Sequence, residues 1–186
     1  KTISEKLSVY ESQLRSILPR EIFGTDNDTL EIVVGKMLAK RNKTISVAES
    51  CTGGYLSHLI TSVPGSSAYF LGGVVSYSNQ VKSEALDVNP ELIKQHGAVS
   101  REVVTAMALN VKQKMNTDYA IATSGVAGPD GGSEEKPVGT VWIAVATPEK
   151  VEAKCFTFGE HRMRNIRRAS IAALNELRLE LLETIG

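Results

Sequence analysis

Apolar residues along this chain recur with two spacings, one typical of helices and one typical of strands. The helical spacing predicts helices near 3–17, 30–38, 55–63, 79–86, 90–96, 100–115 and 166–181. Short continuous or alternating apolar runs predict strands near 45–49, 72–77, 118–123, 139–146 and 151–158. Because helices and strands alternate and the last two strands read as a hairpin, we expect an α/β fold. The specific prediction is a three-layer α/β/α domain with a mixed, mostly parallel sheet.

The first part of the chain differs in character from the rest. Apolar residues every three or four positions predict a helix that Pro19 ends, and residues 23–29 are polar and contain glycine, as linkers do. We therefore divide the chain into an N-terminal helix and linker at 1–27 and a domain at 28–186. Asp28, followed three residues later by a glutamate, is expected to cap the first helix of that domain.

Polar or glycine-rich loops follow three of the predicted strands. They contain the turn after Glu49, the stretch 77–79, and the stretch 124–132. In an open α/β sheet, ligands bind beyond the carboxyl ends of the parallel strands. We therefore expect these loops to meet and to form a binding site at one edge of the sheet.

Ser50 and Lys82 are the candidates for chemistry at that edge. Ser50 lies between a strand and a helix, where it is either a nucleophile or simply a helix cap. Lys82 falls about one turn into the helix after Tyr77, and a lysine kept neutral by burial can take a serine proton directly or through a tyrosine hydroxyl. Taken alone, Lys82 reads as a solvated helix residue. Cys51 is either a rival nucleophile or a small buried filler.

Composition excludes several classes of protein. Lys and Arg together number 21, as do Asp and Glu, and this balance argues against a nucleic-acid partner. The two cysteines are too few and too far apart for a disulfide framework or zinc site, and the acidic residues near 130–135 lack histidine partners, so we expect no metal there. With no apolar run long enough for a membrane and no leader-like start, we expect a cytoplasmic protein. The first residue is Lys1, which suggests a piece of a longer protein.

Several motifs occur together and in order, and they carry a resemblance to a known family. They are AESCTGG at 48–54, YSN at 77–79 with Lys82, HGAVS at 96–100, SGVAGPDGG at 124–132 and KPVGT at 136–140. With these motifs the chain resembles the C-terminal domain of the CinA family over about residues 28–185. The preceding residues are similar to the tail that leads into this domain in full-length CinA proteins, which carry a further N-terminal domain.

The resemblance implies an activity, because the CinA family includes nicotinamide mononucleotide deamidases. On this reading the domain hydrolyses the carboxamide of that nucleotide to nicotinic acid mononucleotide and ammonia, without a metal or cofactor. Ser50 would be the nucleophile, Lys82 the general base and Tyr77 a proton relay or positioning group. The alternative is a nucleotide-binding or regulatory module of a larger protein that turns nothing over.

The resemblance also implies substrate contacts at the same edge of the sheet. The amides near Thr52, Gly53 and Gly54 would hold an oxyanion or a phosphate, and Glu49 would orient Lys82, bind ribose hydroxyls or act as a structural acceptor. The other residues expected to bind substrate are Asn79, Ser124, Gly125, Gly128 and either Arg162 or Arg164. Apolar faces on the first and last helices further favour a homodimer or higher homo-oligomer.

Overall fold

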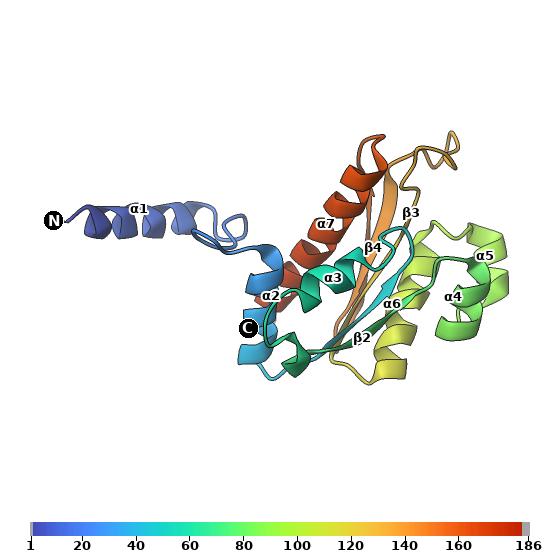
Figure 1. Cartoon of the computed structure of the whole chain (residues 1–186), viewed down its shortest axis with the longest axis horizontal. Helices are drawn as coiled ribbons and strands as arrows, with labels where there is room; N and C mark the ends of the chain where they lie inside the picture. Colours follow the sequence, from blue (N-terminus) through green and yellow to red (C-terminus); the bar gives the residue numbers. More distant parts are fainter. Residues whose placement is uncertain (1, 184–186) are drawn as a thin grey trace.

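A mixed five-stranded sheet divides the domain into three layers (Figure 1). The computed structural model describes residues 2–183, so residues 184–186 of the predicted domain lie outside the described part. The strand order is β2-β1-β3-β4-β5. The strands are β1 (Ile45–Glu49), β2 (Phe70–Val75), β3 (Tyr119–Gly125), β4 (Thr140–Ala146) and β5 (Val151–Thr157).

The pairing of the strands brings the carboxyl ends of β1, β2 and β3 to one edge of the sheet. Strand β1 is parallel to β2 and to β3, whereas β4 is antiparallel to both of its neighbours. Glu49, the last residue of β1, lies opposite Val75 of β2 and Thr123 of β3. The segments that follow these strands therefore begin side by side, as predicted, and the predicted fold class is confirmed.

Helices cover both faces of the sheet, and each face buries its own apolar core. Long helix α7 lies across one face with α2 and α3, while α6 covers the other with α4 and α5 outside it (Figure 1). Apolar side chains from one stripe of each helix fill both cores, which is the burial that stabilises such layers. The helices are α2 (Leu30–Lys40), α3 (Tyr55–Thr61), α4 (Asn79–Leu86), α5 (Pro90–His96), α6 (Arg101–Met115) and α7 (Arg162–Glu183), with a short 3₁₀ turn, η1, at Ser66–Ala68.

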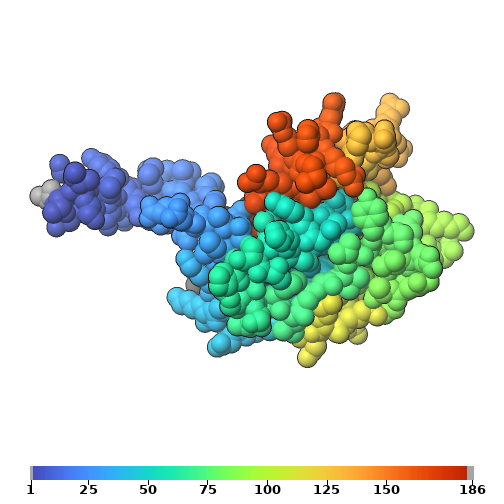
Figure 2. Space-filling model, viewed as in Figure 1, coloured from blue at the N-terminus to red at the C-terminus, as the bar shows by residue number. Residues whose placement is uncertain are grey.

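Helix α1 (Ile3–Ile17) projects from the body as a separate arm (Figures 1 and 2). Its N-terminus is closed by a capping box between Thr2 and Glu5, which stabilises a helix locally. None of its residues is buried, and Ile3 and Ile17 on its apolar face are 79% and 72% exposed. The predicted homo-oligomer stays a prediction.

Two local expectations were wrong. Thr29, and not Asp28, occupies the N-cap of α2 and makes no side-chain cap bond. Asp28 instead accepts hydrogen bonds from the Thr25 amide and from Lys36 Nζ, which hold the linker against α2. Strand β2 also begins two residues earlier than predicted and ends at Val75, because its pairing with β1 starts at Phe70. Within residues 2–183, no helix has the length and hydrophobicity needed to cross a membrane.

Candidate active site

The turn that carries Ser50 is fixed by backbone contacts at the end of β1. The Ser50 amide donates to the Thr123 carbonyl at 3.0 Å, and the Ser50 carbonyl accepts from the Gly53 amide at 3.1 Å. Gly53 and Gly54 have φ values of 60° and 96°, a left-handed backbone that glycine adopts without strain. The turn therefore leads from strand β1 to helix α3 in five residues, with Ser50 8% exposed at its start.

Glu49 supports this turn, because donors of the turn and of the following helix engage its carboxylate. Its fully buried carboxylate accepts hydrogen bonds from the amides of Gly54, Leu56 and Ser57 at 2.8–3.0 Å and from the Ser57 hydroxyl at 2.6 Å. These donors belong to the first turn of α3, whose N–H groups have no partner within the helix. Of the three roles considered for Glu49, these bonds match that of a structural acceptor. No described contact joins Glu49 to Lys82.

Lys82 lies directly beside Ser50. The Ser78 hydroxyl caps α4 by accepting from the Val81 amide, so the helix starts immediately after β2 and turns Lys82 inward. Lys82 Nζ donates to Ser50 Oγ at 3.0 Å and to the Ser76 carbonyl at 2.8 Å. The lysine is only 1% exposed, so the interpretation as a solvated helix residue is wrong.

Burial sets the charge of the groups around Ser50. Loss of water lowers the pKa of Lys82 below its ordinary value of 10.5, since a buried ammonium is less well solvated than a neutral amine. No carboxylate forms an ion pair with Lys82 within residues 2–183. Burial raises the pKa of the Cys51 thiol to about 12, so that thiol stays protonated near neutral pH. The lowered pKa of Lys82 suits a base, and the raised pKa of Cys51 favours the interpretation of this residue as a buried filler over that of a nucleophile.

A pocket of about 300 Å³ opens over Ser50. Arg162, the first residue of α7, crosses it: Nη1 donates to the Gly128 carbonyl at 2.8 Å and Nη2 to the Tyr77 hydroxyl at 3.0 Å. Both Arg162 and Arg164 are exposed, but only Arg162 is among the lining residues. The lining residues are Ser50, Cys51, Tyr77, Val99, Gly125, Val126, Ala127, Gly128, Asp130, Gly131 and Arg162.

Tyr77 lines the pocket but does not connect the serine to the lysine. Its hydroxyl accepts from Arg162, whereas Lys82 reaches Ser50 without an intermediary. A proton relay through Tyr77 is therefore unnecessary in this geometry, and the positioning role remains.

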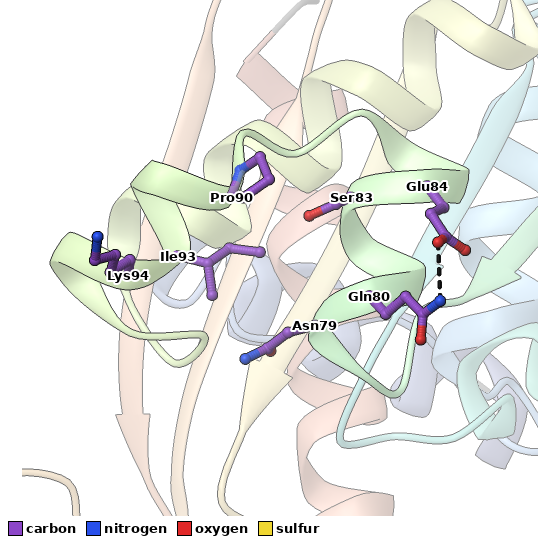
Figure 3. A pocket seen from close by; sticks show the side chains of 7 residues that line it. All are labelled: Asn79, Gln80, Ser83, Glu84, Pro90, Ile93 and Lys94. Atoms are coloured by element: carbon purple, nitrogen blue, oxygen red, sulfur yellow. Dashed lines mark hydrogen bonds between the residues drawn. The ribbon is translucent and has the colours of Figure 1, made fainter.

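Three side chains from the set expected to bind substrate do not line the pocket. The Thr52 hydroxyl is 2.8 Å from that of Thr123, and the Ser124 hydroxyl donates to the Ala98 carbonyl at 2.7 Å, so both side chains are engaged inside the protein. Asn79 lines a different hollow between α4 and α5, together with Gln80, Ser83 and Lys94 (Figure 3). Of the predicted set, the pocket brings together Ser50, Tyr77, Gly125, Gly128 and Arg162, with Lys82 behind Ser50.

Of the amides near Thr52, Gly53 and Gly54 that were expected to hold an oxyanion, only that of Thr52 has no acceptor in the described residues. The Gly53 and Gly54 amides are engaged by Ser50 and Glu49. In the described part of the chain, no other residue accepts a hydrogen bond from the amides of Cys51 and Thr52. These two amides are the donors next to Ser50 that remain available for an oxyanion.

Nothing in the sequence indicated that two further residues belong to the site. Asp130 is exposed, as a solvated residue would be, and it also lines the pocket with Arg162. Asn165 was not predicted, although it is buried and donates to the Ala127 carbonyl of the pocket wall. Neither a glycine-rich loop nor the first turn of α7 carries a sequence pattern that marks these two residues as part of a site. Among residues 2–183, no three histidine, cysteine or acidic side chains gather closely enough to hold a metal ion.

Comparison with known proteins identifies the family. The CinA C-terminal domain family matches residues 27–181. A CinA-like protein of Cytophaga hutchinsonii is 49% identical over 93% of this chain, and a putative competence-damage inducible protein of Moorella thermoacetica is 52% identical over 79% of it. The chain spans only 42% and 36% of the lengths of those two relatives.

Solved structures agree with this match. A competence-damaged protein (CinA) superfamily member from Klebsiella pneumoniae is 32% identical with a TM-score of 0.80, over 83% of this chain and 96% of its own. A competence/damage inducible protein from Agrobacterium tumefaciens is 33% identical with a TM-score of 0.80, over 87% of this chain and 98% of its own. The chain therefore belongs to the CinA family, and its residues 27–181 correspond to the C-terminal domain of that family.

Proposed function

We propose that this domain is an amidohydrolase that converts nicotinamide mononucleotide to nicotinic acid mononucleotide and ammonia. The observation that carries the proposal is the contact of 3.0 Å between Lys82 Nζ and Ser50 Oγ, made by a lysine that is 1% exposed. A nucleophile and a base within hydrogen-bond distance are the arrangement that covalent amide hydrolysis requires.

The reaction follows from this pair. Neutral Lys82 takes the proton of Ser50, whose Oγ attacks the carboxamide carbon and forms a tetrahedral intermediate. Lys82 then gives that proton to the amide nitrogen, the C–N bond breaks, and ammonia leaves an acyl group on Ser50. Water loses a proton to Lys82, attacks the acyl carbon and releases the carboxylic acid, after which the proton returns to Ser50 Oγ.

The negative oxygen of each intermediate needs donors beside Ser50. The amides of Cys51 and Thr52 are the two that no other described residue occupies, and they stand one and two residues after the nucleophile. Backbone N–H groups fixed in this way stabilise developing charge without reorganising during the reaction. In the proposed mechanism they replace the Gly53 and Gly54 amides.

The walls of the pocket suit the remainder of a nucleotide. Arg162 supplies a guanidinium for a phosphate, and Asp130, which lines the same pocket, supplies acceptors for ribose hydroxyls. Gly125 and Gly128 line the same pocket, and packing requires glycine at both positions, since a Cβ would lie 2.6 Å from the Thr140 carbonyl oxygen at the first and would overlap a Val138 methyl group at the second. A carboxamide at Ser50 and a phosphate at Arg162 thus match the two ends of nicotinamide mononucleotide.

The rate should depend on pH through Lys82. Only the neutral amine can accept the serine proton, and burial lowers its pKa. We therefore expect kcat/KM to rise with pH as Lys82 deprotonates and to reach a plateau at high pH. The apparent pKa of this rise should lie below 10.5. Ammonia release measured across a pH series gives this profile. A rate that falls with rising pH over that range would exclude Lys82 as the base.

Arginine 162 should govern affinity for the phosphate end. Changing Arg162 to alanine is expected to raise KM for nicotinamide mononucleotide about 10-fold or more, because a charge-assisted contact contributes roughly 1.5–3 kcal/mol. Arg164→Ala, two residues further along α7 and outside the pocket, is the matched control and should leave KM within about 2-fold. Steady-state kinetics give KM for both variants. An equal change in KM for Arg162→Ala and Arg164→Ala would contradict a specific contact between Arg162 and the phosphate.

The rival function is binding without turnover. Calorimetry with nicotinamide mononucleotide, run beside an assay for ammonia and nicotinic acid mononucleotide, separates the two. Binding together with both products supports the amidohydrolase. Binding without either product would instead favour the nucleotide-binding module, and ammonia from other amides but not from this nucleotide would point to a different substrate.

A further inference from the structure

Asn165 connects the pocket wall to the first turn of α7. It is 1% exposed, and its Nδ2 donates to the Ala127 carbonyl at 3.0 Å and to the Gly159 carbonyl at 2.7 Å. Ala127 belongs to the glycine-rich loop that lines the pocket, and Gly159 lies in the segment leading to Arg162. One buried amide thus joins the two parts of the chain that form this wall.

The two polar atoms of the Asn165 amide differ in how well they are paired. Asn165 Oδ1 is buried and has no hydrogen-bond partner within residues 2–183. A buried acceptor without a donor costs about 1–3 kcal/mol, but an apolar side chain would instead leave the Ala127 and Gly159 carbonyls without this donor. The two donated bonds therefore suggest a role in shaping the pocket wall.

Those bonds fix the direction of one peptide group. In a trans peptide the C=O and the following N–H point in opposite directions. Because the Ala127 carbonyl points to Asn165, the Gly128 N–H points away from α7, and it has no acceptor in the described residues. Gly128 lines the pocket, and its own carbonyl accepts from Arg162. An available N–H group and a guanidinium therefore lie at the same residue.

We propose that Asn165 is a positioning residue that holds the Ala127–Gly128 peptide so that the Gly128 N–H, with Arg162, binds the phosphate of the substrate. The inference rests on the proposed function for the identity of that substrate. It assigns Asn165 to phosphate affinity and leaves Ser50 and Lys82 responsible for the chemistry.

The kinetic test replaces Asn165 by alanine. KM for nicotinamide mononucleotide should rise about 5-fold or more while kcat changes less than about 3-fold, since the chemical groups are untouched. The preference for the mononucleotide over nicotinamide riboside, which lacks the phosphate, should fall by a similar factor. Ser170→Ala is the matched control: Ser170 is also buried on α7, but its hydroxyl donates within the helix to the Ile166 carbonyl. That variant should keep both KM and the preference.

Unchanged KM and preference in a folded Asn165→Ala protein would overturn the inference, as would a loss confined to kcat. If that variant does not fold, nuclear magnetic resonance on the unmodified chain decides. The Gly128 amide signal should shift on titration with nicotinamide mononucleotide and with inorganic phosphate, and much less with nicotinamide riboside. A Gly128 signal that stays still while other pocket amides shift would contradict the proposal. Because this titration needs no turnover, it separates failure of the inference from failure of the deamidase assignment.

Discussion

Replacing Lys82 by methionine is expected to lower kcat/KM for nicotinamide mononucleotide about 10³-fold, the typical contribution of a positioned general base. Methionine has a similar length and is apolar, so it fills the buried space without offering a base. The substitution removes the contact between Lys82 Nζ and Ser50 Oγ at 3.0 Å, together with the hydrogen bond to the Ser76 carbonyl at 2.8 Å. Ammonia release measured on both proteins gives the ratio. Lys94→Met, at a lysine whose side chain is 76% exposed on α5, is the control and should retain full activity.

The same variant separates activity from stability. A charged lysine at this buried position destabilises the folded protein, so Lys82→Met should be at least as stable as the unmodified chain at neutral pH. Because burial lowers the folded pKa, the penalty is fully present below that pKa and is lost as pH rises toward 10.5. Urea unfolding at several pH values should show the difference shrinking with rising pH. An active variant would contradict Lys82 as the base, and a difference that grows with rising pH would contradict a charged lysine that is penalised by burial.

Replacing Ser50 by alanine is expected to lower kcat by about 10⁴-fold or more, because removal of a nucleophile leaves no route to the acyl-enzyme. Cys51→Ala is the matched control in the next position. Its thiol is buried with a pKa raised to about 12, so the variant should lose a small amount of stability and keep kcat within about 5-fold.

Steady-state ammonia release distinguishes the two residues, provided that circular dichroism shows both variants folded. If Cys51→Ala lost turnover and Ser50→Ala kept it, the thiol would be the nucleophile. Equal and complete losses in folded proteins would mean that the turn, and not a single side chain, is required.

The fold was predictable because its determinants are local. Helical and alternating apolar spacing located the elements, and the glycine-rich loops after β1 and β3 indicated the edge at which ligands would bind. The register that places Glu49 beside Val75 and Thr123 then followed from parallel pairing. Errors were confined to element ends, such as the N-cap of α2.

The site was only partly predictable because side-chain direction depends on tertiary packing. Glu49, Thr52 and Ser124 are polar residues at strand ends, but each turns into the protein to satisfy a neighbouring polar group. Asn79 is on the correct helix, yet it faces the hollow beside α5 (Figure 3). Spacing along the sequence cannot separate these orientations from that of Lys82.

Contacts between residues far apart in the sequence explain why Asn165 was not predicted and why the choice between Arg162 and Arg164 was not made. The choice between Arg162 and Arg164 rests on contacts with Tyr77 and Gly128, which lie far away in the sequence. Asn165 gains its importance from the Ala127 carbonyl, 38 positions earlier. Such pairings appear only once the loops and α7 are placed together.

The most direct test of the proposed amidohydrolase is ammonia release from nicotinamide mononucleotide by the unmodified chain, followed over many turnovers beside Ser50→Ala. We predict continuous release by the unmodified chain, with one nicotinic acid mononucleotide formed for each ammonia, and none above background by the variant. No release by an unmodified chain that binds the nucleotide, or equal release by both proteins, would contradict the serine–lysine mechanism.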